Sequence, residues 1–487
     1  MPTVHLRIND ATTNLPTAVR LRLTGPNGEA YAPFGRSVAI PLGRGEEVGA
    51  GLALGRERWF PIDGACEVAL PAETPIRLQA AKGPFFTPID ETFTLGPGQI
   101  SRRTTITRRH DPKAGGWYGA DLRSHFITPH AAALEADAED LDLAAVQALD
   151  FPDAMLDGRT YLTTPNLDAF SGPTAYPYPG RAARIAVGTL NRHAVLGQVG
   201  LVGSHRIVFP LTFGPPDATD DWSLIDWCDQ CRRKNGLPIW IDPFTTISGV
   251  NSGEGLIALI LGKLNHLEFD GEPRKQSLLP VTYRLLNAGI DVGLVGSTGK
   301  ETNRVQLGGV RTYAKLPVDT PLTLPRWIEA FRAGPSLVTN GPWLTLTHDN
   351  GVFHAKAECI APFDALELLA HGVPIAKVLP TAANGWWTAS LEHTPDKPAN
   401  WFAARVGGPA SPLNPSQPLF AHTSPLHFPG AAPLRRSESD LAVFRNAIES
   451  TIDWIEAHGR FNEPRRRDAM LGYAREALGK LEVANPA

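Results

Sequence analysis

The stretch that decides the fold runs from residue 115 to residue 143 and reads GGWYGADLRSHFITPHAAALEADAEDLDL. Its first part, up to Phe126, mixes aromatic, apolar and small residues and predicts a short strand. Pro129 then begins an alanine-rich segment that predicts a helix, and Leu141 and Leu143 begin a second apolar run. A strand, a helix and another strand in close succession indicate an α/β body.

Composition is typical of a soluble globular protein. The chain has 487 residues, 43% hydrophobic and 20% charged, enough for about two to four domains. Lys and Arg total 46 against 50 Asp and Glu, so the formal charge of -4 leaves no electrostatic footprint for nucleic acid or an anionic membrane. No signal peptide is visible, and no apolar run approaches the ~20 residues of a membrane helix. We therefore expect a soluble, cytoplasmic protein without nucleic-acid or membrane partners; a mis-called start codon would leave secretion open.

Residues 1–112 predict an N-terminal β-sandwich. Apolar and polar residues alternate over Val4–Ile8 and Val19–Leu23, and Gly25–Gly28 is a strong turn. Further short apolar runs follow, separated by Gly and Pro. The expected role of this segment is packing or presentation.

Residues 113–341 change rhythm to strands that alternate with helices. A Pro- and Gly-rich insertion over 151–180 is long enough to form a lid or rim loop. Strands are expected at 117–125, 143–149, 185–190, 205–213, 237–242, 266–269, 290–295 and 309–316. Repeated β-α units imply either a barrel or a doubly wound sheet.

The remainder predicts a second β-sandwich over residues 342–430 and two helices within 431–487. Five apolar, β-prone runs supply the strands of the sandwich. Over 438–458 and 463–483 the apolar residues recur with a period of 3.6, which indicates two amphipathic helices that pack back on the body.

Three motifs resemble the CehA/McbA family of metallohydrolases, a branch of the polymerase-and-histidinol-phosphatase (PHP) superfamily. They are Gly116-Trp117-Tyr118 with the strand that follows it, Leu307–Tyr313, and Thr339–Pro342. The resemblance spans about residues 115–428. It implies a central distorted β/α barrel of the TIM type, flanked by the two β-sandwiches and followed by the helices.

The resemblance is poor at the metal ligands, and the first departure lies in the opening strand. The family's first strand ends in Asp-Leu-His-x-His, whose histidines bind metal at the barrel mouth. Asp121, Leu122 and His125 match that pattern, but Arg123 stands in place of the first histidine. A guanidinium group stays protonated and cannot coordinate a cation.

Ligands gather at the carboxyl ends of parallel strands, so polar residues at those ends are the candidate site. They are Asp121, His125, Asn191, His193, Asp242, Glu268, Asp270, Ser297 and Thr298. The family resemblance implies more donors than this set offers, including a histidine where Asp242 precedes Pro243. The metal candidates are His125, Asp121, His193 and Asp242; the catalytic candidates are Asp242 or Glu268 as general base, and Arg123.

Two outcomes stay open for this site. In one, Arg123 turns outward and the remaining donors hold a single divalent metal, Zn, Mn or Fe, which activates water to attack an ester, carbamate or phosphoester bond. In the other, which we favour, Arg123 takes the metal's electrostatic place and pairs with Asp121 or Asp242. The protein is then a ligand-binding or scaffold protein without a metal, and a small molecule is the expected ligand.

Other candidates have structural interpretations. Cys228 and Cys231 form a lone C-x-x-C within an apolar-periodic segment, so a packed helix is favoured over a zinc or redox site. Glu135 and Glu139 are expected on a helix surface, with an inward turn of Glu135 left open. Ser297 has no Gly-x-Ser-x-Gly elbow around it and indicates a turn.

Overall fold

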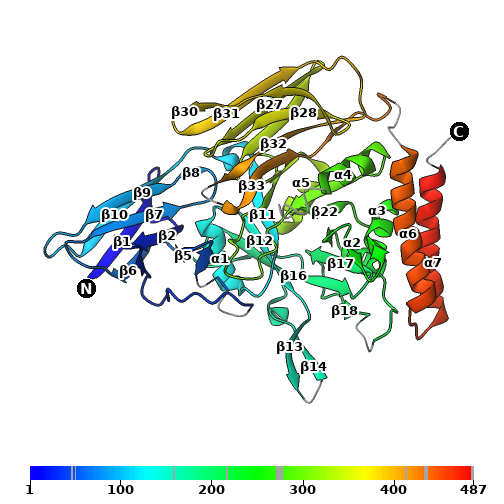
Figure 1. Cartoon of the computed structure of the whole chain (residues 1–487), viewed down its shortest axis with the longest axis horizontal. Coiled ribbons are helices and arrows are strands. Elements are labelled where there is room, and N and C mark those ends of the chain that lie inside the picture. The colour runs from blue at the N-terminus through cyan, green and yellow to red at the C-terminus, as the bar shows by residue number, and fades with distance from the viewer. Residues whose placement is uncertain are drawn as a thin grey trace.

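The fold is described from a computed structural model, which describes residues 1–44, 48–49, 51–156, 159–214, 218–269, 278–411, 414–432 and 437–483. Three lobes surround a central body (Figure 1). The N-terminal strands lie on the left in blue, a second group of strands lies at the top in yellow, and two long helices lie on the right in orange and red.

The N-terminal lobe is a sandwich of two sheets. One has the order β6-β1-β10-β8, and the other has the order β4-β5-β2-β7-β9 with β3 beside β2. Alternating apolar residues of β1 and β2 are buried between the sheets, as the sequence pattern predicts. The strands are β1 Thr3–Asp10, β2 Val19–Thr24, β3 Ala30–Tyr31, β4 Leu52–Leu54, β5 Glu57–Ile62, β6 Ala65–Ala69, β7 Pro75–Ala81, β8 Phe86–Thr87, β9 Ile89–Thr94 and β10 Ser101–Arg108.

The central body is built on a 16-stranded sheet, counted over the described residues. Its main path is β23-β22-β19-β17-β16-β12-β11-β24-β25-β33-β32-β28-β29. The strands are β11 Trp117–Ser124, β12 Leu143–Ala148, β15 Tyr176–Pro177, β16 Arg184–His193, β17 Gly197–Val202, β18 Thr212–Phe213, β19 Leu237–Ile241, β22 His266–Phe269, β23 Gly293–Gly296, β24 Arg311–Lys315, β25 Ser336–Thr339, β28 Ala365–Ala370, β29 Val373–Val378, β32 Trp401–Ser411, β33 Asn414–Thr423 and β34 Leu426–His427.

The expected barrel of the TIM type is wrong. The chain is mostly β, and its large sheet is mixed rather than a closed ring of parallel strands. After β16 the chain turns back at once into β17, which pairs antiparallel with both β16 and β19. β24 and β25 are antiparallel as well, and β33 carries the sheet onward beyond residue 341.

The error has a physical cause. An apolar run predicts a buried strand but carries no information on strand direction, which the intervening turn decides. His193 pairs with Gly197, whose φ is 113°, so the chain forms a tight hairpin here, whereas the sequence predicted the next strand only at 205–213. The predicted strand at 205–213 forms only at its end, as β18 Thr212–Phe213, and the strand that follows β16 in the hairpin is β17 Gly197–Val202.

Seven helices pack on this framework in the described residues. They are α1 Pro129–Ala138, α2 Leu224–Arg232, α3 Gly253–Ile260, α4 Leu278–Asn287, α5 Leu324–Ala333, α6 Glu438–His458 and α7 Pro464–Val483. The last two helices lie where the sequence predicts them. Both contact α3, so they extend the core of the central body at the right of Figure 1.

The upper lobe closes a second sandwich against the end of the large sheet. A four-stranded sheet has the order β26-β27-β31-β30, and its apolar residues pack against those of β28 and β32. The strands are β26 Trp343–Asp349, β27 Val352–Cys359, β30 Thr381–Ala383 and β31 Trp386–His393. One face of this sandwich is thus continuous with the central sheet.

Two small hairpins complete the described structure, β13 Phe151–Leu156 with β14 Arg159–Thr163, and β20 Thr246–Ile247 with β21 Val250–Asn251. The first belongs to the insertion that the sequence predicts as a lid or rim loop, and it projects below the body in Figure 1.

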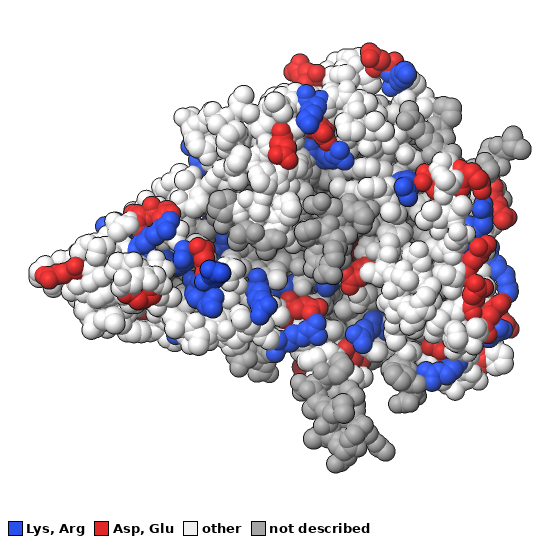
Figure 2. Space-filling model, in the orientation of Figure 1, with Lys and Arg blue, Asp and Glu red and all other residues white. Residues whose placement is uncertain are grey.

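None of the described helices is both long and apolar enough to cross a membrane. Acidic and basic side chains alternate along the outer edge of the two C-terminal helices (Figure 2).

Candidate functional site

The candidate residues of the first strand lie inside the curled sheet. β11, β12, β16, β19, β22 and β23 run in the same direction, so their carboxyl ends lie at one edge. The sheet curls so that the end of β11 faces the ends of β22 and β23, although these strands are not hydrogen-bonded neighbours. We call this edge the mouth; it contains Arg123, His125, Asp121 and Glu268.

Arg123 points into the mouth and forms an ion pair with Glu268. Its Nε donates to Glu268 Oε1, which also accepts the hydroxyl of Ser297 at 2.5 Å. The Arg123 side chain is 9% exposed and that of Glu268 is fully buried. Gly299, at a φ of 62°, makes room, because a Cβ there would collide with Arg123 Nη2. The surrounding chain therefore leaves room for this ion pair, and the acid at Arg123 Nε is Glu268.

His125 lies beside this pair. Its Nε2 is 3.4 Å from Arg123 Nη1, and the side chain is buried. Burial, and then the charge of Arg123, lower the pKa of His125 to about 3. The imidazole is therefore neutral at ordinary pH.

Asp121 serves as an anchor for two loops. Oδ1 accepts the N–H groups of Thr298 and Arg123 at 3.0 and 3.3 Å, and Oδ2 accepts the Thr298 hydroxyl and the Gly308 N–H, the latter at 2.8 Å. Burial raises the pKa of this carboxyl group, while those hydrogen bonds lower it. Four donors already surround the carboxylate, so little of its acceptor capacity remains for a metal.

His193 lies in a different place and holds a different structure together. Its Nδ1 accepts the N–H groups of Val195 and Leu196, and its Nε2 lies 2.9 Å from Asp220 Oδ1. Asp220 in turn accepts the N–H of Arg460 at 2.7 Å. Both ring nitrogens are used, so His193 links the β16–β17 turn to the segment between α6 and α7.

Asp242 follows β19 in a left-handed conformation, with a φ of 47°. Its Oδ2 accepts Gln198 Nε2 at 2.5 Å, and its backbone carbonyl accepts the Thr245 hydroxyl. Asn191 holds the loop between β17 and β18, because its Nδ2 donates to the carbonyls of Val208 and Pro210. Asp270 lies outside the described residues.

The carboxylates of Glu135 on α1 and of Glu139 directly after it are buried, although a helix surface was expected for both, with an inward turn of Glu135 left open. Glu135 Oε1 lies 3.1 Å from Lys300 Nζ, and both side chains are fully buried. Glu139 Oε1 lies 2.7 Å from Arg20 Nη1, with both side chains 2% exposed. These ion pairs could not be predicted from the sequence, because both cations come from distant segments, one of them the N-terminal sandwich.

The residues of the mouth do not fit a metal ion. A guanidinium group lies between His125 and Glu268, where it would repel a divalent cation. In the part of the chain that the structure describes, no three His, Cys, Asp or Glu residues come together in a manner that could hold a metal. The predicted ligand set of His125, Asp121, His193 and Asp242 is not gathered at one point.

The C-x-x-C pair is a helix core feature. Cys228 and Cys231 are buried on α2, and both are free thiols. Burial raises the pKa of the Cys231 thiol to about 12 and that of Cys228 well above its usual value. This bears out the prediction of a packed helix, since neither thiol ionises readily.

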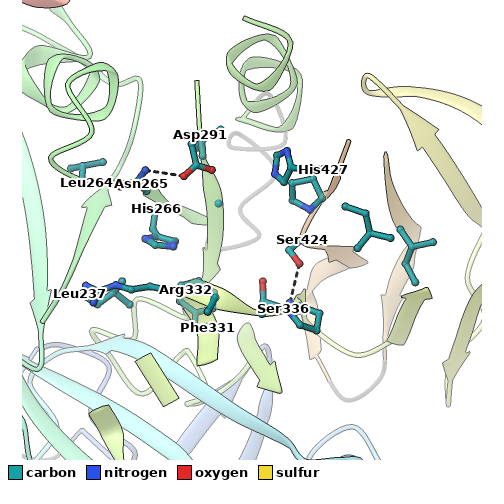
Figure 3. A pocket seen from close by; sticks show the side chains of 18 of the residues that line it. Leu237, Leu264, Asn265, His266, Asp291, Phe331, Arg332, Ser336, Ser424 and His427 are labelled. Atoms are coloured by element: carbon teal, nitrogen blue, oxygen red, sulfur yellow. Dashed lines mark hydrogen bonds between the residues drawn. The ribbon is translucent and has the colours of Figure 1, made fainter. Parts of the chain in front are cut away.

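A cavity of about 900 Å³ opens at the opposite edge of the sheet. Figure 3 shows it between two walls, and we call it the cleft. One wall contains the first residues of β19, β22 and β23, which are Leu237, His266 and Gly293, together with the end of α5. The other wall contains Ser336, Ser424 and His427.

Nothing in the sequence indicates this cleft. Phe331 and Arg332 lie on its first wall, but in the sequence they belong to an ordinary amphipathic helix. His266 marks only the beginning of a strand. The cleft depends on how the central sheet meets the upper sandwich, which no local pattern encodes.

Comparisons with known proteins add little. No family model and no curated protein matches the chain. A solved structure that is similar in part is PsfC from Pseudomonas syringae, at 17% identity over 44% of this chain and 89% of PsfC, with a TM-score of 0.30. A similarity of that size carries no argument about fold or function.

Proposed function

We propose that this protein acts by binding, as a ligand-binding or scaffold protein, and that an internal ion pair stands in its mouth where metallohydrolases of the CehA/McbA type hold metal. The observation that carries the proposal is the contact between Arg123 and Glu268. The carboxylate that could serve as ligand or general base is already neutralised by a fixed positive charge.

The neighbouring groups support the same conclusion. The acceptor atoms of Asp121 are engaged with backbone and hydroxyl donors, and the imidazole of His125 lies against a cation. To admit a metal, Arg123 would have to leave a space that is shaped around its guanidinium group. That would separate a buried cation from its carboxylate partner. On composition alone, we further propose a cytoplasmic protein without nucleic-acid or membrane partners.

Metal analysis of the purified full chain tests the proposal. After dialysis against Zn²⁺ or Mn²⁺ and then buffer, the unchanged protein should retain far less than one metal ion per chain. Arg123→His removes the charge and supplies the missing donor, so this variant should retain more metal than the unchanged protein. His125→Ala in the Arg123→His background should lose that gain. Arg326→His is the control for adding a histidine, because Arg326 is an exposed residue of α5.

The outcomes separate the alternatives. Near-stoichiometric Zn, Mn or Fe in the unchanged protein, lost on His125→Ala and accompanied by turnover of an aryl ester or aryl phosphate, would overturn the proposal in favour of a hydrolase. If neither the unchanged protein nor Arg123→His retains metal, the role given to Arg123 is refuted, because its charge is then not what excludes the ion.

A further inference from the structure

We propose that the cleft binds a small organic anion that carries a flat ring, with its carboxylate or phosphate group at Arg332 and its ring against His266 and Phe331. This inference rests on the proposed function in that the chain acts by binding. It concerns the edge of the sheet opposite the mouth, so it does not depend on whether the mouth excludes metal.

The first observation is positive charge without a matching acid. Arg332 donates Nη1 to the Asn235 carbonyl at 3.2 Å and Nη2 to the Gly236 carbonyl at 2.5 Å. Arg232 donates to the Gly262 carbonyl. Within the described ranges neither guanidinium forms an ion pair, and each has donors left over.

The two cations are near each other and near His266. Burial, and then the charge of Arg232, shift the pKa of Arg332 downward, although the Cys231 thiol opposes this. Burial, followed by Arg332 and Arg232, lowers the pKa of His266 to about 3. Two like charges that repel each other on one wall are stabilised by a bound oxyanion, which accepts charge-assisted hydrogen bonds.

One carboxylate, Asp291, also lines the cleft. It is engaged with Asn265, whose Nδ2 lies 3.1 Å from Asp291 Oδ2, and it lies apart from Arg332 in Figure 3. The cleft lining therefore carries two positive charges and one negative charge when the histidines are neutral. An anion, rather than a cation, is the ligand that this wall favours.

The second observation is an aromatic column that ends at the cleft. Trp327 stacks on Phe331 with ring centroids 5.2 Å apart and planes at 15°, and Phe331 is followed by His266 at 4.8 Å and 38°. Trp327 is fully buried, whereas Phe331 and His266 line the cleft. Gly293 leaves room for the imidazole, because a Cβ there would lie 3.1 Å from His266 Cδ2. A flat ligand ring would extend the column by one member.

The two features lie side by side on one helix. Arg332 directly follows Phe331 on α5, and Figure 3 shows both next to His266 on the same wall. On the opposite wall the Ser424 hydroxyl accepts the N–H of Ser336 at 2.9 Å, which leaves its proton for a ligand. A cavity of this size, here between the central sheet and the upper sandwich, is typical of small-molecule sites.

Calorimetric titration of the full chain with five probes tests the inference. Benzoate and phenyl phosphate carry both ring and anion, acetate and inorganic phosphate carry only the anion, and benzyl alcohol carries only the ring. We expect at least one of the first two to bind about tenfold or more tightly than its ringless counterpart and than benzyl alcohol. Which of them binds more tightly identifies the carboxylate or the phosphate as the preferred group.

Variants locate the site. Arg332→Gln should weaken binding of the preferred probe about tenfold or more, since it removes a charged donor. Arg326→Gln is the matched control, because Arg326 is also on α5 and also donates to a backbone carbonyl, but it does not line the cleft. His266→Asn should reduce the preference for a ring while leaving inorganic phosphate binding within about twofold.

The inference is overturned if none of the anions binds at about 10 mM, if Arg332→Gln and Arg326→Gln behave alike, or if the ring brings no gain in affinity. Should His266→Asn fail to fold, exposed Arg332 still provides the decisive comparison. Failure here with a metal-free mouth refutes the cleft alone. Anion binding together with stoichiometric metal refutes the proposed function alone.

Discussion

The mouth and the cleft lie at opposite ends of the same strands and treat charge in opposite ways. At the end of β22 in the mouth, Glu268 is fully buried and paired with Arg123. At the beginning of β22, in the cleft, His266 lies near two arginines that have no acid partner in the described part of the chain. The strand thus joins a site that holds a buried ion pair to a site whose arginines form no ion pair among the described residues, although His125 Nδ1 in the mouth is buried without a hydrogen-bond partner.

This difference is a better guide to function than position in the fold. The carboxyl ends of parallel strands are where ligands are usually sought. Here those ends carry carboxylates that are already occupied by Thr298, Gly308 and Arg123. The two arginines at the amino ends form hydrogen bonds to backbone carbonyls but no ion pair within the described ranges, so their charge is not matched by an acid there.

Breaking the buried ion pair should have the largest effect. Glu268→Ala removes a carboxylate that pairs with the buried charge of Arg123 and should lower the free energy of unfolding by about 3–5 kcal/mol, measured by urea denaturation. Asp90→Ala is the control, because it removes the partner of Arg77 from a pair that is about half exposed and should cost about 1 kcal/mol or less. Equal effects of the two substitutions would show that the mouth is open to water and that the Arg123–Glu268 pair is not buried as the structure indicates.

A carboxylate outside both sites, that of Glu254, makes the stability of the folded chain depend on pH. Glu254 is buried, and it accepts only neutral donors, the Ser223 hydroxyl at 2.8 Å and the Leu224 N–H at 2.7 Å. Burial raises its pKa from 4.5 to about 7, opposed by those hydrogen bonds. The folded chain therefore binds this proton more tightly than the unfolded chain.

The sign of the effect follows from that difference. The stability that Glu254 contributes is full below pH 4.5 and is lost as pH rises toward 7, by about 3 kcal/mol. Glu254→Gln should remove this loss, so that the free energies of unfolding at pH 4.5 and 7.5 differ less than in the unchanged protein. Glu476→Gln on exposed α7 is the control for charge removal, and a pH slope that survives Glu254→Gln would contradict the prediction.

The smallest effect should separate the two cleft arginines. Arg232→Gln should weaken binding of the preferred anionic probe only about two- to threefold, because the proposal places the oxyanion at Arg332 and leaves Arg232 a through-space effect. In about 0.5 M NaCl that contribution should largely disappear, while the effect of Arg332→Gln should persist. A larger loss for Arg232→Gln than for Arg332→Gln would place the anion at the other end of the wall.

Local patterns predicted much of the secondary structure. The alternation in β1 and β2, the period of α6 and α7, and the burial of Cys228 and Cys231 on α2 all follow from side-chain spacing. Such spacing does not determine which strands pair, so the antiparallel β17 and the continuation into β33 were missed and a barrel was expected in their place.

Of the candidate site, the sequence predicted only the unusual arginine and its pairing with an acid. The substitution of Arg123 for a histidine was visible in the sequence, and so was the expectation that an acid would pair with it. That the acid is Glu268 depends on the curl of the sheet, which brings together residues 145 positions apart. The buried partners of Glu135 and Glu139 were hidden for the same reason, since Lys300 and Arg20 come from remote segments.

The pairing of β25 with β33 determines whether the chain can be divided into two separate proteins. Because Leu337 to Thr339 bond to Ala421 to Thr423, the upper sandwich and the central body share one ladder across residue 341. A chain divided there would give two fragments, each with an unpaired edge strand that is prone to aggregation. Neither half can be expressed by itself without a new cover for that edge, so we expect fragments divided at residue 341 to aggregate.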